Sequence, residues 1–372
     1  MDVNVSRTED RNTAKKKMIL PLQAWRGIFI IMIFVLHVCP ELIPFLAGGN
    51  ECISFFVILS GFCLTLSNKK YDCSVKGIAS YSFSRTMKFY PLYCLVLFCF
   101  TAENLFSIIV SHNFANLLPF LFQLLVSILL LQAFVPGKYL PFELNGPAWY
   151  LSATSFFYVV FIPILTFVKK TERYILGIIF ALFALHIGIV IVLQGSDNFC
   201  FWTYYFPPFR CIEFAIGICL GLVFKQHRNT LKSVFFFSII EITVIVLFVF
   251  HRVLFKYTDF YSLINGYYSL IAIVIAVSII YTFSFSKGIV SKVLSNKLFV
   301  FIGNISFEIY IVHALAVEGY FLFFKGRTNI YLKTIIVIFF TAFIISGYKF
   351  LVYLFKKHKS KNINKRKKEQ II

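Results

Sequence analysis

The chain has 372 residues, of which 59% are hydrophobic and 14% are charged. A soluble domain carries about a quarter charged residues, so this composition excludes an ordinary soluble protein. The formal net charge of +20 is compatible with a nucleic-acid partner, but most lysines and arginines lie in short segments between long apolar runs. That distribution is typical of membrane proteins, and we predict a lipid bilayer and no nucleic acid as partner.

Ten apolar runs approach or reach the roughly 17–25 residues that a helix needs to cross a bilayer. They cover residues 18–38, 52–67, 89–111, 149–168, 174–194, 210–224, 233–251, 262–283, 298–324 and 330–355. The sequence therefore predicts an all-α polytopic membrane protein of about ten transmembrane helices. Its integral-membrane domain, residues 18–355, lies between two basic tails, residues 1–17 and 356–372.

The basic residues also predict the orientation, because lysine and arginine are enriched in cytoplasmic loops. With ten spans and both termini in the cytoplasm, the inner segments carry 27 of the 36 basic residues and the outer loops carry 6. An eleventh apolar run, residues 115–134, would reverse this balance if it crossed. We therefore predict that residues 115–134 are re-entrant or lie at the outer face, which requires protein or water to cover their backbone.

The nine cysteines form no Cys-x-x-Cys pair and show no spacing typical of metal ligands, so the sequence predicts no metal site. Most of them lie in apolar runs and are expected to pack as small hydrophobic residues. Cys52 and Cys200 are both predicted to face the outside and could meet there, but nothing in the sequence requires a disulfide.

Arg26 and His37 lie in the first apolar run, where ionisable groups are costly. They are 11 residues apart, which on a helix corresponds to about 16 Å of rise and three turns plus about 20°. Both side chains thus share one face, Arg26 near the cytoplasmic end and His37 near the outer end. That face offers an anion-binding group and a base able to deprotonate a hydroxyl. Alternatively, Arg26 reaches the lipid headgroups and His37 caps the helix.

Six motifs follow one another along residues 22–313: "LQAWRGIFIIMIFVLH" (22–37), "FFVILSGF" (55–62), "SRTMKFYPLY" (84–93), "PAWYLSATSFFY" (147–158), "RCIEFAIGICLG" (210–221) and "ISFEIYIVH" (305–313). In this order they resemble the acyltransferase-3 family of membrane acyltransferases. The first motif carries the Arg-x10-His pattern of that family. Each match is short, so the resemblance depends on all six motifs occurring in the order that they have in the family.

The resemblance implies a ten-helix O-acyltransferase of the cell membrane. Such an enzyme takes an acyl group, usually acetyl, from cytoplasmic acyl-CoA and delivers it to a cell-surface polysaccharide or lipid-linked sugar. Arg26, Arg85 and Lys88 are then candidates to bind the CoA phosphates. His37 is the candidate base, acting either on the acceptor hydroxyl directly or after an acyl-enzyme has formed.

Arg85 and Lys88 lie one helical turn apart on the predicted cytoplasmic side. The family usually has a second arginine at the position of Lys88, which supplies charge but not bidentate hydrogen bonds. Alternatively, both residues only set the topology. His313 is expected in mid-span, where it orients the thioester, acts as a second base, or is simply a buried histidine bonded to a backbone carbonyl.

Four residues are candidates for binding the acceptor: Trp149, Ser152, Arg210 and Glu213. Trp149 could stack on a sugar or anchor its helix at the membrane surface. Arg210 and Glu213, at i and i+3, could contact substrate or form a structural ion pair, and Glu213 could also pair with His37. Family members often carry acidic residues where this chain has Ser54 and Thr154, so no role for those acids carries over.

A competing hypothesis is an exporter of polysaccharide or lipid-linked sugar that performs no acyl transfer. Buried charges along a path through the membrane would suit a transporter equally well. Transporters often show paired or inverted repeats, and this sequence shows no detectable repeat. We therefore favour the acyl-CoA-dependent O-acetyltransferase.

Overall fold

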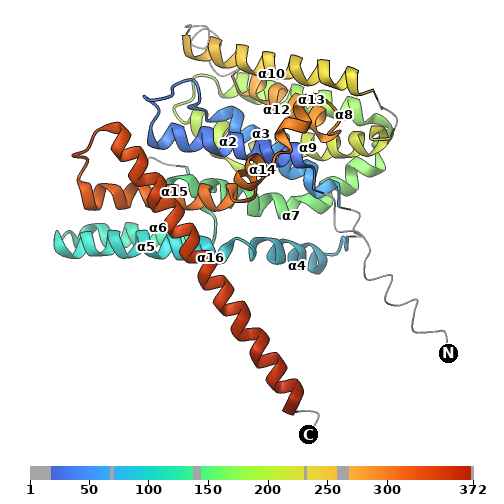
Figure 1. Ribbon diagram of the computed structural model, residues 1–372. Helices are drawn as coiled ribbons and strands as arrows, with labels where there is room; N and C mark the ends of the chain where they lie inside the picture. The colour runs from blue at the N-terminus through green and yellow to red at the C-terminus, as the bar shows by residue number, and fades with distance from the viewer. Residues whose placement is uncertain (1–17, 68–70, 137–143, 230–232, 258–267, 370–372) are drawn as a thin grey trace.

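The computed structural model describes residues 18–67, 71–136, 144–229, 233–257 and 268–369 (Figure 1). These residues form helices and their connections, without a β-strand among them. The α-helices are α2 (Leu20–Val38), α3 (Asn50–Thr65), α4 (Val75–Thr86), α5 (Tyr90–Val110), α6 (Leu117–Ile128), α7 (Trp149–Lys170), α8 (Ile175–Leu193), α9 (Pro207–His227), α10 (Val234–Tyr257), α12 (Tyr268–Ser284), α13 (Ile289–Leu294), α14 (Lys297–Asn304), α15 (Ser306–Phe324) and α16 (Ile330–Glu369).

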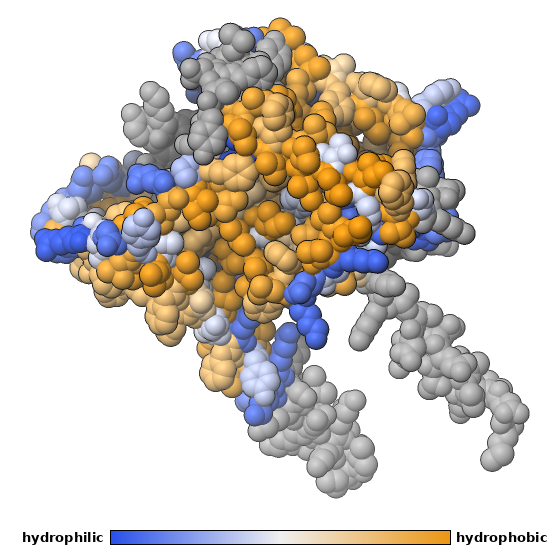
Figure 2. Space-filling model, turned by 45° about the horizontal axis from the view of Figure 1, so that its top comes forward, coloured by the Kyte–Doolittle hydropathy of each residue, from blue (hydrophilic) through white to orange (hydrophobic). Residues whose placement is uncertain are grey.

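Eight helical segments are long and apolar enough to cross a membrane: Leu20–Val38, Tyr90–Val110, Gly146–Lys170, Glu172–Leu193, Phe201–His227, Val234–Leu254, Ser306–Phe324 and Ile330–His358. Three apolar helices are shorter: Asn50–Thr65, Phe114–Ile128 and Ser269–Ser284. On the face shown in Figure 2, hydrophobic residues cover a broad area and hydrophilic residues lie at its edges. The chain is thus an all-α, multi-pass membrane protein, as the composition predicted.

Some helix boundaries differ from the predicted ones. The predicted span 298–324 is two helices, α14 and α15, which meet at Ile305. His313 lies seven residues after the start of the 19-residue α15, near the middle of this shorter span. The apolar character is the same on both sides of Ile305, so hydropathy could not reveal the break. Residues 262–267 of another predicted span lie outside the described residues.

The ambiguous segment 115–134 contains the 12-residue helix α6, which is shorter than a full span. The hydroxyl of Tyr90 donates a hydrogen bond to the Ile128 carbonyl oxygen at 2.8 Å, and that of Tyr93 donates to the Ser127 carbonyl oxygen at 2.8 Å. Both tyrosines belong to the first turn of α5, so α6 folds back along α5. Protein therefore satisfies backbone carbonyls at the end of this segment, as a re-entrant segment requires.

Helix α3 lies at the centre of the bundle, between α9 and α12, with α4 and α5 along one side of the molecule and α10 along the opposite side (Figure 1). Its close approach to α9 depends on two glycines. A methyl group at Gly61 would lie 2.2 Å from the Phe214 carbonyl oxygen, and one at Gly217 would lie 2.1 Å from the Ile58 carbonyl oxygen. Small residues let membrane helices pack backbone against backbone in this way.

Loops predicted to face the same side contact each other. At the predicted cytoplasmic end, which we call the inner end, the Gln226 side chain donates to Glu172 at 2.9 Å. At the opposite, outer end, Arg252 donates to the carbonyl oxygens of Phe45 and Ala47. Arg252 follows the apolar run 233–251, so the sequence places it in an outer loop. In the structure it is a buried residue of α10 and forms an ion pair with Glu51.

Candidate active site

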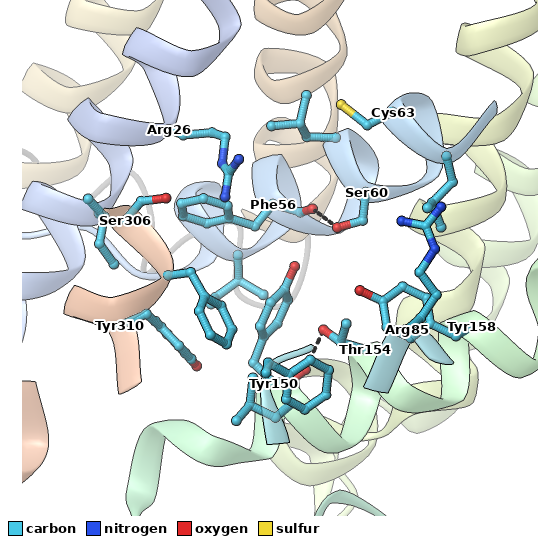
Figure 3. Close-up of a pocket in the computed structure, with 17 residues that line it drawn as sticks. Arg26, Phe56, Ser60, Cys63, Arg85, Tyr150, Thr154, Tyr158, Ser306 and Tyr310 are labelled. Atoms are coloured by element: carbon cyan, nitrogen blue, oxygen red, sulfur yellow. Dashed lines mark hydrogen bonds between the residues drawn. The ribbon is translucent and has the colours of Figure 1, made fainter. Parts of the chain in front are cut away.

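A cavity of about 330 Å³ opens between α2, α3, α4, α7 and the start of α15, and we call it the inner cavity (Figure 3). Arg26 and Ile30 of α2 line it, one helical turn apart. Its other polar lining residues are Ser60, Cys63, Arg85, Tyr150, Thr154, Tyr158, Ser306 and Tyr310. Its volume is within the range of small-molecule sites, roughly 300–1,000 Å³.

The inner cavity is electropositive. Arg26 and Arg85 both line it, and no aspartate or glutamate is among its lining residues in the described part of the chain. Arg26 Nη1 donates to the Gln23 side chain at 3.2 Å, and the Arg85 guanidinium lies 5.2 Å from the ring centroid of Tyr81. Burial raises the pKa of the Tyr81 hydroxyl well above its ordinary value, so Tyr81 stays neutral and does not cancel the charge of Arg85.

Arg85 also lines a second, surface cavity of about 500 Å³ at the inner end, together with Lys76 and Lys88. The predicted pair of Arg85 and Lys88 is thus brought together at one site. Because Arg85 lines both cavities, the surface cavity and the inner cavity are adjacent. Asp72 also lines the surface cavity, but its carboxylate accepts hydrogen bonds from the backbone and side chain of Ser74.

A third cavity of about 250 Å³, the outer cavity, lies toward the outer end. Ile33 and His37 of α2 line it. Arg26 and Ile30 face the inner cavity, so the predicted common face of α2 is continuous from Arg26 to His37. Trp149 also lines the outer cavity, only 5% exposed, with its ring centroid 5.2 Å from that of Tyr204. Trp149 therefore packs inside the protein and does not anchor its helix in the lipid.

Ile53 and Tyr310 line both the inner and the outer cavity and form the partition between them. The Tyr310 hydroxyl donates a hydrogen bond to the carbonyl oxygen of Pro147, just before α7. Its ring meets the ring of Tyr150 edge-on, with 5.7 Å between centroids. A substrate that extends from Arg26 to His37 would therefore have to pass Tyr310.

His37 and His313 form a hydrogen-bonded pair beside the outer cavity. His37 Nδ1 lies 3.2 Å from His313 Nε2, and the rings are stacked with 5.1 Å between centroids. His313 Nδ1 lies 3.1 Å from the Ile309 carbonyl oxygen, which can only accept. Neutral His313 must then carry its proton on Nδ1 and accept at Nε2. His37 must donate from Nδ1, which leaves its Nε2 as the basic nitrogen.

His313 is 1% exposed and lines neither of these two cavities, so we expect it to act by positioning His37. We expect His313→Ala to lower acyl transfer about ten- to a hundredfold without changing acyl-CoA binding, because His37 loses the acceptor that fixes its tautomer. His313→Gln should restore part of the rate, since its amide oxygen can accept from His37 Nδ1. The measurement is kcat and KM for the three proteins. An equally large loss of rate in His313→Ala and His313→Gln would contradict the positioning role of His313.

The side chains of the other predicted acceptor-binding residues are engaged in contacts within the protein. Arg210 and Glu213 are completely buried and form an ion pair, and Arg210 Nε also donates to the Tyr204 carbonyl oxygen at 2.8 Å. Glu213 therefore pairs with Arg210 and not with His37. Ser152 Oγ accepts from the Ala133 backbone N–H at 3.4 Å. None of these three side chains lines the inner or the outer cavity.

The structure adds residues that the sequence did not single out as site residues. Tyr150, Tyr310 and Ser306 line the inner cavity, and Tyr204 and Tyr205 line the outer one. Tyr310 and Ser306 belong to the motif "ISFEIYIVH", and Tyr150 to "PAWYLSATSFFY". Their presence in these motifs was the available signal, but an apolar helix gives no indication of which tyrosine or serine faces a cavity.

The described residues contain no cluster of three or more histidine, cysteine or acidic side chains able to hold a metal ion. The polar groups that line the two cavities are arginines, hydroxyls, one thiol, the Trp149 indole and the His37 imidazole. Comparison with known proteins decides the family. The sequence pattern described as an acyltransferase domain matches residues 21–364. The chain belongs to this acyltransferase family.

Curated relatives of this acyltransferase-family chain include proteins of Staphylococcus aureus strains COL and N315 that carry the provisional name O-acetyltransferase. Each is 22% identical over 382 aligned residues, which cover 97% of this chain and 61% of the relative. The chain thus spans about three fifths of the length of these relatives. No solved structure matches it. The resemblance found in the six motifs is confirmed at the level of the family.

Proposed function

We propose that this acyltransferase-family protein moves an acyl group, most simply acetyl, from acyl-CoA at the inner end to a sugar hydroxyl at the outer end. The observation that carries the proposal is one continuous face of α2, with Arg26 in an electropositive cavity and His37 in the adjacent cavity. His37 is fixed by His313 in the tautomer that a general base requires.

The donor would bind from the inner end. Its phosphate groups would be held by Arg26, Arg85 and Lys88, since guanidinium and ammonium groups form strong charge-assisted hydrogen bonds to phosphate. Its apolar arm would run between Ile30, Phe56 and Leu59, which line the inner cavity. The thioester would then pass the partition at Tyr310 and come beside His37.

The reaction needs one proton acceptor. His37 Nε2 takes the proton of the acceptor hydroxyl while its oxygen attacks the thioester carbonyl carbon. The C–S bond then breaks, and the CoA sulfur takes the proton back from His37. Positive charge that develops on His37 is stabilised by the hydrogen bond from its Nδ1–H to His313 Nε2. No proton is gained or lost overall, because His37 returns to its neutral form.

The acceptor would occupy the outer cavity. Trp149, Tyr204 and Tyr205 bring three aromatic rings to this cavity, and the ring centroids of Trp149 and Tyr205 are 5.1 Å apart. Aromatic faces stack on the apolar faces of sugar rings, and their hydroxyl or N–H groups orient the ligand. A cell-surface polysaccharide or a lipid-linked sugar is the acceptor class that this site and the predicted orientation favour.

The proposal is tested with the purified protein in nanodiscs and radiolabelled acetyl-CoA, with cell-envelope extract as the source of acceptor. We expect wild type to bind and consume acetyl-CoA, and Arg26→Ala to bind it about ten- to a hundredfold more weakly, as loss of a charged hydrogen bond implies. Arg173→Ala is the matched control, because Arg173 is another inner-end arginine that lines neither the inner nor the outer cavity.

Cys63 provides an independent measure of donor binding. It is exposed and lines the inner cavity, so bound acetyl-CoA should protect it from a maleimide reagent. The exposed Cys73 does not line this cavity and should react equally with and without acetyl-CoA. If wild type neither binds nor consumes acetyl-CoA and Cys63 is not protected, the enzyme proposal fails and an exporter becomes the better account.

A further inference from the structure

We propose that Ser306 and the N-terminal end of α15 form, with Arg26, the site that binds the diphosphate of the CoA donor. This inference rests on the proposed function and adds to it a ligand group and two protein elements. Ser306 is 2% exposed, lines the inner cavity, and its buried hydroxyl has no hydrogen-bond partner among the described residues. In Figure 3 this hydroxyl lies on the cavity side of α15, toward Arg26.

The start of α15 is suited to an anion. The first N–H groups of a helix have no partner within the helix, and the helix dipole places partial positive charge there. The residue that precedes α15, Ile305, provides no side-chain cap. Ser306 and Arg26 both line the inner cavity, and Ser306 belongs to the helix end that carries the uncapped N–H groups. The N-terminal end of a helix is suited to binding a phosphate.

Close packing of α14 against α2 places these groups together. A methyl group at Gly303 would lie 1.8 Å from the Gln23 carbonyl oxygen, and one at Gly27 would lie 3.0 Å from the Gly303 backbone nitrogen. Only glycine permits this approach between the turn of α2 that carries Arg26 and the residues just before Ser306. The break at Ile305 then directs the new helix end toward the cavity.

The charges around the site agree with an anionic ligand. Glu308, in the first turn of α15, lies 3.4 Å from Lys349 of α16 and does not line the inner cavity. Arg85 lines the same cavity from α4. Within the described ranges, Arg26 and Arg85 are thus the charged residues that line this cavity together with Ser306, and both are positive.

The length of the donor favours the diphosphate over the other phosphate of CoA. Thirteen bonds separate the nearer diphosphate phosphorus from the thioester sulfur, which at the roughly 1.2 Å per bond of an extended chain is about 16 Å. The 11 residues from Arg26 to His37 correspond to the same rise along α2. A diphosphate at Arg26 and Ser306 therefore places the sulfur at His37, and the 3′-phosphate is left for Arg85 and Lys88.

The test compares four ligands that shorten CoA stepwise from its nucleotide end. They are CoA, 3′-dephospho-CoA, 4′-phosphopantetheine, which lacks the adenosine and one further phosphate, and pantetheine, which has no phosphate. Ser306→Ala, in neutral phosphatidylcholine nanodiscs, should raise Kd for the first three by the same factor, about tenfold, because each keeps a phosphate at the site. Its Kd for pantetheine should not change. Ser306→Asp should weaken the first three further, yet stay folded, since a carboxylate is favourable at a helix N-terminus.

Ser155→Ala is the matched control, because Ser155 also has a buried hydroxyl without a partner but lies outside both cavities. The inference is overturned if Ser306→Ala leaves the Kd of all four ligands unchanged, or if it weakens pantetheine binding as much as CoA binding. Neither result would contradict the proposed function. If phosphatidylglycerol weakens CoA binding in wild type but not in Ser306→Ala, the site binds a lipid phosphate instead. Failure of wild type to bind any of the four would overturn the proposed function as well.

Discussion

Replacing His37 by alanine is expected to lower the rate of acyl transfer about a hundred- to ten-thousandfold, the usual contribution of a general base. Binding of acetyl-CoA should be unchanged, since the phosphates are held near Arg26, about 16 Å away along α2. The loss should therefore appear in kcat and not in KM. The measurement is steady-state transfer of radiolabelled acetyl groups, paired with a direct binding assay on the same nanodisc preparation.

His227→Ala is the matched control for His37→Ala. His227 is an exposed histidine near the inner end of α9, lines neither the inner nor the outer cavity, and should keep the wild-type rate. A His37→Ala protein with undiminished transfer would exclude His37 as the base. It would leave the cavities with a binding role only, such as that of an exporter or of a scaffold in glycan assembly.

The second large effect is on stability. Arg252→Ala should lower the free energy of unfolding by about 3–5 kcal/mol, because it leaves Glu51 as a buried charge without its ion-pair partner. Arg252 Nη2 also donates to the carbonyl oxygens of Phe45 at 2.8 Å and Ala47 at 2.5 Å. These bonds fix the loop that leads to Gly49, a lining residue of the outer cavity. The variant should thus lose acceptor binding as well as stability.

A double-mutant cycle tests this role. The double variant Glu51→Gln/Arg252→Met removes both charges. Its loss of unfolding free energy should therefore be smaller than the sum of the losses in the two single variants. Thermal unfolding in nanodiscs measures all four proteins. Arg327→Ala, at a surface arginine of the outer end, serves as the control and should change stability by less than about 0.5 kcal/mol. If the losses of unfolding free energy in the two single variants add up to the loss in the double variant, the ion pair is not the cause of the destabilisation.

Features that depend on neighbouring residues could be predicted from the sequence. The apolar runs predicted the helices, and the spacing of Arg26 and His37 predicted their common face, because helical periodicity follows from local geometry. The six ordered motifs predicted the family, which the match over residues 21–364 confirms. The same pattern could not predict the break at Ile305, since hydropathy does not change there.

Features that depend on distant residues were decided by the tertiary structure. His37 and His313 are 276 residues apart in the chain, and their pairing depends on how α15 packs against α2. Arg252 and Glu51 pair across 201 residues, although the apolar runs placed Arg252 in the loop after residues 233–251. The sequence by itself determined that this is an all-α membrane protein of the acyltransferase family with Arg26 and His37 on one helix face. Only the packing of helices, which brings remote side chains within hydrogen-bond distance, decided which groups form the site.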